Sequence, residues 1–417
     1  MKRCCKNVDI LSDGFIEDAT FSALAEKWNR NDVAKYLSDF TIQWSKKQIH
    51  NLLSIPSQRQ WMSGIISTSA EVIRQEIRER DLKVEPIRYS LRKDGHAGKL
   101  REIGVECVKQ LILDEVANIA CEELWRKKIG YHQYAALAGK GQINGKKAIE
   151  NQIRKHYMQS RWCWKGDVRH CYNTVNIRTL KRMLSRDIKN ETLLYLLFFL
   201  IDTYKEGLNI GSGLSQYLCN YYLARAYRYV LSLRKVRKHK NGTVESRRLV
   251  YFTLFYMDDI ILVGAREADV RRAAALLAKF LKKELGQEIK ADAVLFKIDY
   301  FRKDVKKDFT SYKEKDKAIR RGRPIDMMGF VVYRDHTEIR EGTFLRARRA
   351  YMRVWRKISS GKTISLKTAQ RCSSYFGYFK NTDSLHFREK YHIDALMKYC
   401  GRVVSYYAKS EFYGATA

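Results

Sequence analysis

The chain of 417 residues has only three prolines, and no stretch rich in proline, glycine or serine separates one part from another. Its nine cysteines form no Cys-x-x-Cys pair, which favours reduced thiols over a zinc site or a disulfide framework. The longest apolar run, residues 193–201, is too short to span a bilayer, and the first residues have no secretory signal. We therefore expect a cytoplasmic protein without a membrane partner, whose subdomains are continuous in space.

Acidic residues are also scarce, because 46 Asp and Glu stand against 80 Lys and Arg, a formal net charge of +34. Like charges in such excess repel one another, so the composition indicates a polyanionic partner. The basic residues run through the whole chain with aromatic residues between them. This distribution favours nucleic acid held in a long cradle over a lipid-binding patch. With 45% hydrophobic residues, the chain can build two or three packed subdomains.

Hydrophobic periodicity predicts the order of the helices and strands. Residues 1 to about 80 have a helical pattern, and residues 86–105 predict two short strands around a Gly-rich, basic turn. A helix over residues 108–127 follows, then a strand that opens at Trp162, and then a helix over residues 212–233.

Two hairpins and another helix come next. The Asn-Gly pair at 241–242 predicts the turn of the first hairpin, and the second hairpin has residues 257–259 at its tip. The following helix has Asp269 as its N-cap and Gly286 as its C-terminal stop. The order strand–helix–strand–strand–helix–strand is that of a split βαβ, ferredoxin-like sheet, which is an α+β arrangement.

The tip of the second hairpin carries two adjacent acids, Asp258 and Asp259, inside the apolar run LFYMDDIILVG. Such a pair is ordinarily a polar turn, but the apolar arms predict that this tip is partly buried. Unpaired buried carboxylates are costly unless something neutralises them. Asp167 supplies a third acid, and a ferredoxin-like sheet places its strand beside the hairpin. The three acids can share two divalent metal ions, for which we expect Mg²⁺, with Mn²⁺ as the alternative.

The motifs YMDD at 256–259 and DVRHCY at 167–172 give the chain a resemblance to the reverse transcriptases, from about Arg88 to about Ile393. The resemblance implies an RNA-directed DNA polymerase with a right-hand fold of fingers, palm and thumb. The expected parts are an N-terminal helical region (1–84), fingers (85–160), palm (161–340, with fingers residues interleaved at about 176–207) and thumb (341–417).

The same resemblance implies roles for individual residues. Asp167 and Asp258 resemble the two main metal ligands, with Asp259 the third catalytic acid, and Tyr172 resembles the steric gate that excludes a 2′-hydroxyl. Lys290 is a weaker candidate for protonating pyrophosphate. The further implied roles are dNTP binding by Lys99, Arg101, Tyr172 and Gln216; template contact and fidelity by Ile210, Gly211, Ser215 and Gln216; a primer grip of Met328, Gly329 and Phe330; and nucleic-acid binding by Arg346, Arg349, Arg353, Trp355 and Arg356.

The segment IGSGLSQ, residues 210–216, indicates which reverse transcriptases are most similar. Many members of the family have Gln at the first position and Pro after the second Ser, whereas this chain has Ile210 and Gln216. That departure resembles the reverse transcriptases of diversity-generating retroelements, as do residues 133–149 and 333–341. The resemblance implies miscopying of template adenines. Ile210 removes hydrogen bonds near the nascent pair, which should loosen shape discrimination.

Three alternatives remain open. An antiphage defence reverse transcriptase would make cDNA from a noncoding RNA. A nonenzymatic RNA-binding scaffold is disfavoured because a relic has no reason to keep three costly acids. An RNA-dependent RNA polymerase is disfavoured by Tyr172. The expected partners are a cognate structured RNA template, an RNA–DNA hybrid, dNTPs and an accessory protein or oligomer. We expect no appended endonuclease, integrase or RNase H domain, because the sequence ends at Ala417.

Overall fold

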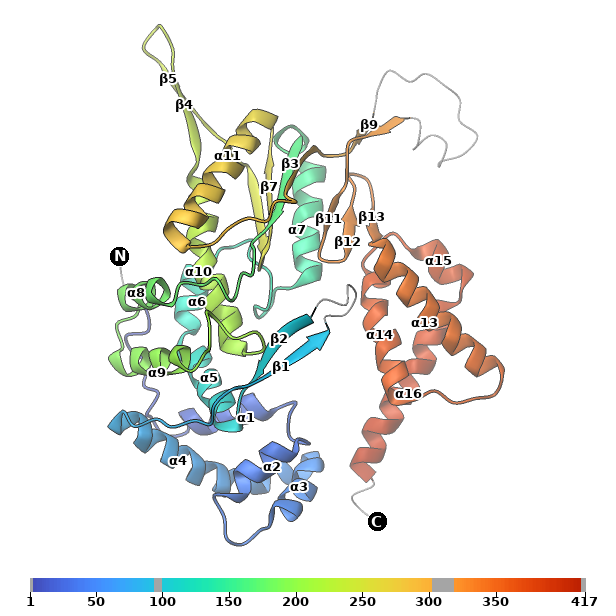
Figure 1. The fold of residues 1–417 in the computed structure, drawn as a ribbon. Helices are drawn as coiled ribbons and strands as arrows, with labels where there is room; N and C mark the ends of the chain where they lie inside the picture. The colour runs from blue at the N-terminus through green and yellow to red at the C-terminus, as the bar shows by residue number, and fades with distance from the viewer. Residues whose placement is uncertain (1–2, 94–99, 302–318, 414–417) are drawn as a thin grey trace. The chain divides into compact units, whose positions relative to one another are not determined.

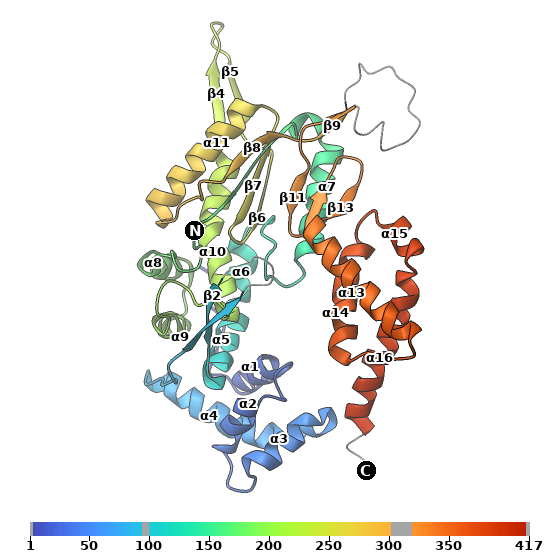
Figure 2. The same cartoon turned by 45° about the vertical axis from the view of Figure 1, so that its right-hand side comes forward.

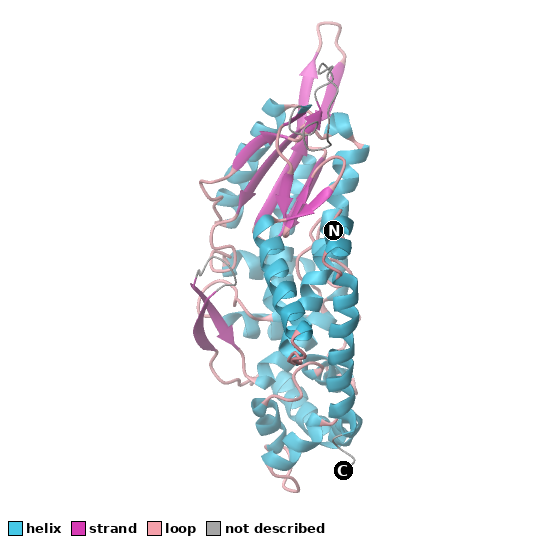
Figure 3. Cartoon of the chain, turned by 90° about the vertical axis from the view of Figure 1, so that its right-hand side faces the viewer, coloured by secondary structure: helices cyan, strands magenta, loops and turns pink. Residues whose placement is uncertain are grey.

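The computed structural model describes residues 3–93, 100–301 and 319–413, and the chain folds as two compact units. The first unit comprises Met1–Tyr131, Arg169–Arg225 and Phe280–Glu288. The second comprises His132–Val168, Ala226–Lys279 and Ile289–Ala417. Figure 3 distinguishes the helices, which make up most of the chain, from the strands.

The first unit is mainly helical, which confirms the helical pattern predicted for its N-terminal part. Its one hairpin, β1 paired with β2, confirms the two strands expected before residue 106. The elements are α1 (Phe15–Leu24), α2 (Asn31–Ser38), α3 (Lys46–Ser54), the 3-10 helix η1 (Pro56–Met62), α4 (Ser63–Glu79), β1 (Arg88–Lys93), β2 (Leu100–Val105), α5 (Val108–Ala120), α6 (Glu122–Lys128), α8 (Ile177–Asp187), α9 (Glu191–Asp202), the first part of α10 (Gly213–Ser232) and the π-helical turn η3 (Leu281–Leu285).

The second unit contains the remaining strands and the C-terminal helices. Its helices are α7 (Gln142–Lys155), the short η2 (Tyr157–Gln159), α11 (Glu267–Phe280), α13 (Glu341–Ser359), α14 (Leu366–Lys380), α15 (Leu385–Lys390) and α16 (Ile393–Tyr413). Its strands are β3 (Trp162–Asp167), β4 (Arg234–Lys238), β5 (Val244–Arg248), β6 (Phe252–Tyr256), β7 (Asp259–Gly264), β8 (Val294–Lys297), β9 (Tyr300–Phe301), β10 (Arg320–Arg321), β11 (Ile325–Met327), β12 (Phe330–Val332) and β13 (Thr337–Ile339).

The central sheet of the second unit has the strand order β6-β7-β3-β8, with every neighbouring pair antiparallel. This order is that of a ferredoxin-like sheet, as the sequence predicted. Residues 260–264 of β7 are all buried, which explains why this strand reads as a continuous apolar run and not as an alternation. In Figure 1 the sheet lies between α11 on one side and α7 on the other.

Two local predictions are wrong. Asp269 is not the N-cap of α11, because the helix begins at Glu267 and Asp269 lies buried in its first turn. There its carboxylate pairs with Arg247 of β5, with N–O 3.1 Å, so a tertiary ion pair explains its position. The single helix expected over residues 108–127 is two helices, because the backbone leaves the helical conformation at Cys121.

The four C-terminal helices, α13 to α16, enclose their own hydrophobic core, with Tyr351 and Phe379 fully buried at its centre. Ser365 begins α14, because its hydroxyl accepts a hydrogen bond from the Thr368 amide. These helices fall within the range expected for the thumb, residues 341–417, and that assignment stays a prediction.

The hairpin β11–β12 turns at Met328 and Gly329, both with positive φ (56° and 84°). A Cβ atom at Gly329 would lie 2.8 Å from the ring of Tyr378, a residue of α14. Glycine is therefore required here twice, by the backbone conformation and by the close approach of an aromatic ring.

We predict that Gly329→Ala lowers the stability of the protein by more than backbone strain alone. Gly361→Ala is a matched control, because Gly361 also has positive φ (70°) but has no atom within 4 Å of the added carbon. The control should cost about 1–2 kcal/mol from its left-handed conformation. Gly329→Ala should cost about 1–3 kcal/mol more through overpacking. Urea unfolding measures both, and equal losses would contradict the close approach.

Candidate active site

Three acids meet at one end of the central sheet. Asp167 is the last residue of β3 and lies directly opposite Asp259, the first residue of β7. The amide of Val168 donates to the carbonyl of Asp258, with N–O 2.9 Å, so the turn of the hairpin is fixed against the end of β3. The tip itself is Met257–Asp258, because Asp259 already pairs with Tyr256 in the strand ladder.

The carboxyl groups of Asp167 and Asp259 lie close enough to shift each other's pKa in opposite directions. Burial, together with a hydrogen bond to Asp167 and the charges of Asp167 and Asp258, raises the pKa of Asp259 to about 7. The hydrogen bond to Asp259 and the nearby Lys290 lower the pKa of Asp167. Each of these neighbouring carboxylates in a partly buried site therefore opposes the ionisation of the other.

Two lysines accompany these acids. The Lys290 ammonium donates to Asp167 Oδ2 at 3.0 Å, and its backbone amide donates to the Asp167 carbonyl at 2.8 Å. Lys165 lies two residues before Asp167, on the same face of β3, and lowers the pKa of Asp259 through its charge. Its ammonium is held by the carbonyl of Asp326, 2.8 Å away. Sequence reasoning missed Lys165, although the two-residue period of a strand places it beside Asp167.

The donor chemistry of this cluster suits a divalent cation. Carboxylate oxygens are the ligands that hard cations prefer, and a cation would relieve the repulsion that raises the pKa of Asp259. Within residues 3–93, 100–301 and 319–413, no three His, Cys, Asp or Glu side chains are arranged to hold a metal ion. Instead, Lys290 lies against the acids and donates to Asp167. Their identity as metal ligands stays a prediction.

In the first unit, residues 207–216 pack closely against β2 and the backbone of Tyr172. The Gly104 amide donates to the Ile210 carbonyl at 3.1 Å, and the Leu208 amide donates to the Tyr172 carbonyl at 3.0 Å. A Cβ atom at Gly211 would lie 2.8 Å from the Gly104 carbonyl. The structure thus gathers Tyr172 and the segment predicted to contact the template in one region.

A buried pair of carboxyl groups, Glu106 and Asp114, anchors this segment. Both side chains are 3% exposed. Asn209 donates to Glu106 Oε1 at 3.0 Å, and the Ser212 hydroxyl donates to Asp114 Oδ2 at 2.5 Å. The Ser212 oxygen in turn accepts from the Ser215 amide at 3.1 Å, which begins α10. Sequence reasoning missed both acids, although an Asp in the apolar run LILDEV is a signal of a buried polar contact.

The other residues predicted to bind nucleotide or template differ in their exposure to solvent. Ser215 is fully buried, so within this structure it supports the segment and has no exposed surface for a template. Gln216 and Ile210 are partly exposed, and Arg101 is exposed on β2. Lys99 lies outside the described residues.

The predicted primer grip lies in the second unit, at the β11–β12 turn. Phe330 is buried, with its ring centroid 5.1 Å from that of Tyr378. Met328 is 6% exposed and packs beside Gly145 of α7. The turn is therefore held between α7 and α14, and its primer-gripping role stays a prediction.

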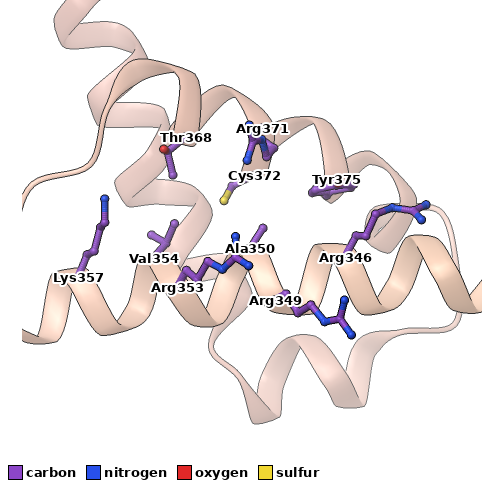
Figure 4. A pocket seen from close by; sticks show the side chains of 10 residues that line it. All are labelled: Arg346, Arg349, Ala350, Arg353, Val354, Lys357, Thr368, Arg371, Cys372 and Tyr375. Atoms are coloured by element: carbon purple, nitrogen blue, oxygen red, sulfur yellow. The ribbon is translucent and has the colours of Figure 1, made fainter. Parts of the chain in front are cut away.

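The predicted nucleic-acid-binding arginines lie along α13. A groove of about 440 Å³ runs between α13 and α14, and Figure 4 shows side chains from the two helices lining it. Five of its ten lining residues are cationic and none is acidic. The lining cations are Arg346, Arg349, Arg353, Lys357 and Arg371.

Arg356 and Trp355 lie apart from this groove. Arg356 lines a second, smaller groove on α13 together with Arg348, Arg349 and Arg353. Trp355 packs against the core of the C-terminal helices, and its indole N–H donates to the Tyr391 carbonyl at 3.0 Å. In this position Trp355 holds two segments of the bundle together. Its predicted role in nucleic-acid binding stays a prediction.

The family of the chain follows from its sequence match. The family model described as reverse transcriptase (RNA-dependent DNA polymerase) matches residues 91–331, more than half of the chain. The chain therefore belongs to the reverse transcriptase family, which confirms the predicted α+β right-hand fold.

Solved structures similar to the chain are themselves polymerases, at low similarity. A Candida tropicalis telomerase truncated from its C-terminal domain is 11% identical, with a TM-score of 0.39, over 73% of this chain and 71% of that one. A Candida albicans telomerase in complex with a fragment of telomeric RNA is 10% identical, with a TM-score of 0.38, over 80% and 55%. A Sicinivirus RNA-dependent RNA polymerase is 13% identical, with a TM-score of 0.34, over 52% and 48%.

These similarities are too low to carry an argument about function, and the chain spans about half the length of the viral polymerase. No curated protein sequence matches the chain. Among the described helices, none is long and apolar enough to cross a membrane.

The buried acid pair predicts how stability depends on pH. Burial raises the pKa of Asp114 well above its ordinary range, and burial also raises the pKa of Glu106. Above a pH of about 4 the folded protein thus holds more protons than the unfolded chain, so the free energy of unfolding falls as pH rises. Asp114→Asn should therefore raise the melting temperature relative to the wild type by about 2–4 °C more at pH 8 than at pH 5.

Thermal melts of the full chain at the two pH values measure this difference. Asp18→Asn, at an exposed position of α1, is the matched control and should shift the melting temperature equally at both. An Asp114→Asn effect of the same size at pH 5 and pH 8 would show that the pair is not protonated in the folded protein.

Proposed function

We propose that this protein is an RNA-directed DNA polymerase that copies a cognate structured RNA, with Asp167, Asp258 and Asp259 as its catalytic acids. The observation that carries the proposal is the cross-strand pairing of Asp167 with Asp259 at the end of the central sheet, in a chain of the reverse transcriptase family. A scaffold without activity would have no reason to keep these carboxyl groups half-buried against one another.

The reaction joins the primer 3′-oxygen to the α-phosphorus of a dNTP and breaks the bond to the pyrophosphate. Bound Mg²⁺ ions, held by the three acids, would activate the hydroxyl and stabilise the leaving group. Lys290, now hydrogen-bonded to Asp167, is the candidate for protonating pyrophosphate. Tyr172 would exclude a ribonucleotide by contact with its 2′-hydroxyl, and Lys99 and Arg101 would bind the triphosphate.

The primer and its template would be held by the second unit. The β11–β12 turn at Met328, Gly329 and Phe330 would position the primer end. The basic groove between α13 and α14 would bind phosphates through its five cations. We expect RNA binding to weaken steeply with salt for this reason.

Primer extension tests the reaction. Asp258→Asn and Asp259→Asn should each lower the extension of a DNA primer on an RNA template by at least about 10³-fold, because each removes a charge needed at the reacting phosphate. RNA binding should remain within about twofold of wild type, because the groove on α13 is untouched. Extension by these variants at the wild-type rate would overturn the proposed function. Asp202→Asn, at an exposed position of α9, is the control.

Within this function, we propose error-prone copying of template adenines, as in the diversity-generating retroelements. The support is the segment IGSGLSQ, in which Ile210 stands where many relatives have Gln, and its close packing against β2. The alternative, a defence reverse transcriptase that makes cDNA from a noncoding RNA, shares the same catalytic acids. Sequencing the cDNA made from the native locus separates the two, because substitutions at template adenines mark the first and faithful or repetitive copies mark the second.

The fidelity role of Ile210 has its own test. Ile210→Gln should lower misincorporation opposite template adenine by about 10-fold, because the amide restores a hydrogen bond that penalises a wrong pair. Ile210→Leu, an apolar replacement of equal size, is the control and should keep the error rate. Primer extension on templates of defined sequence, read by sequencing the products, measures the change. An unchanged set of misincorporations in Ile210→Gln would show that this position does not determine fidelity.

A further inference from the structure

The hairpin formed by β4 and β5 is a two-stranded ribbon that forms a sheet of its own. Figure 2 shows it extending away from the central sheet and from α11. Its base is fixed, because the Leu249 amide donates to the Leu233 carbonyl at 3.1 Å and Arg247 pairs with Asp269 of α11. The turn at its other end is closed by the His239 amide, which donates to the Thr243 carbonyl at 2.9 Å.

The ribbon concentrates positive charge. Residues 234–248 contain seven Lys or Arg and one Glu, so 15 of the 417 residues carry +6 of the formal net charge of +34. All five residues of β4 are exposed, and so are all residues of β5 except Arg247. None of these cations belongs to the groove between α13 and α14, to the three acids or to the β11–β12 turn.

The register of the ribbon places like charges opposite each other. Arg234 pairs with Arg248, and Lys235 pairs with Arg247, in directly opposed cross-strand positions. Such pairs are destabilising, and an isolated two-stranded hairpin is marginal in water even without them. Two of the five cross-strand pairs therefore oppose the conformation of the ribbon, whereas Arg237 faces Glu245, and a bound polyanion would relieve the repulsion of the two like-charged pairs.

One face of the ribbon has a chemical pattern suited to a nucleic-acid backbone. Directly opposed residues and residues two apart share a face. Val236 (60% exposed) and Val244 (59% exposed) therefore lie together with Arg234, Lys238 and Arg248 around them. Apolar side chains between cations match sugars between phosphates. Five residue pairs span about 16 Å, enough to lie along the wide, shallow minor groove of an A-form helix.

We propose that the β4–β5 ribbon is a docking surface for a double-stranded segment of RNA, bound through its phosphates and sugars. The inference rests on the proposed function for the choice of RNA, since the template of this polymerase would be structured. The ribbon would hold a folded part of that RNA while the reacting strand occupies the active site.

A triple variant tests the ribbon without disturbing its fold. Arg234→Gln, Lys238→Gln and Arg248→Gln together remove three cations from one face, and they remove the repulsion between Arg234 and Arg248. The matched control removes three exposed cations in the same unit, one just before α11 and two within it, by Arg266→Gln, Arg272→Gln and Lys279→Gln. The probes are an RNA hairpin of about 20 base pairs, its DNA counterpart and a single-stranded RNA of equal length.

The ribbon variant should bind the RNA hairpin about 10-fold more weakly at about 100 mM KCl, and the slope of log affinity against log salt should fall by about 2–3. The α11 variant should change affinity by less than about threefold, since its cations lie outside the ribbon. Single-stranded RNA binding should change little in either variant, and extension of a short primer–template at saturation should stay at the wild-type rate.

Equal losses in the two variants would show that binding depends on diffuse charge, and this would overturn the proposal. Unchanged RNA binding in the ribbon variant would also overturn the proposal, and a protein would then be the partner to test for this surface. A larger loss for the DNA duplex than for the RNA duplex would overturn the choice of RNA. Because binding is measured without nucleotides, the binding result can be interpreted even if the protein proves not to be a polymerase.

Discussion

The pairing of Asp167 with Asp259 across two antiparallel strands is the constraint on which the active end of this protein depends. Strand register fixes it, because a shift by one residue would move either acid to the opposite face of the sheet. Burial and the neighbouring Asp167 carboxyl group together raise the pKa of Asp259 to about 7. Lys165 and Lys290 lie beside the pair and favour the charged form of the acids, whereas burial and mutual repulsion disfavour it. A bound cation would offset the burial and the repulsion.

In the first unit, residues 207–216 belong to no strand, and two backbone hydrogen bonds connect them to Gly104 and Tyr172. Residues 207–216 are anchored by side chains, chiefly Glu106, Asp114, Asn209 and Ser212, in a buried network. Buried carboxyl groups can serve in such a network only when protonated or hydrogen-bonded, and here both conditions contribute. The segment to which we assign fidelity is thus held mainly by polar side chains, whereas the hairpin that carries Asp258 and Asp259 is held by backbone pairing.

The excess of positive charge is divided among surfaces of distinct shape. The groove between α13 and α14 is concave and lined by five cations, whereas the β4–β5 ribbon is a projecting surface with apolar side chains between its cations. A concave groove suits a strand or helix that passes along it, and a ribbon suits the outside of a duplex. Composition alone reports the total charge and cannot distinguish these shapes.

The sequence by itself determined the local features of this protein. Alternating and apolar runs predicted the strands, the Asn-Gly pair predicted the hairpin turn, and the YMDD tip with Asp167 predicted a carboxylate cluster in a ferredoxin-like sheet. Each of these depends on neighbours within a few residues or on a known order of elements.

Only the tertiary structure decided the rest. Asp269 pairs with Arg247, Trp355 packs into the helical bundle, and Glu106 with Asp114 anchors a loop about 100 residues away. These contacts join residues far apart in the chain, and a side chain's environment is set by what packs against it, which local sequence does not encode.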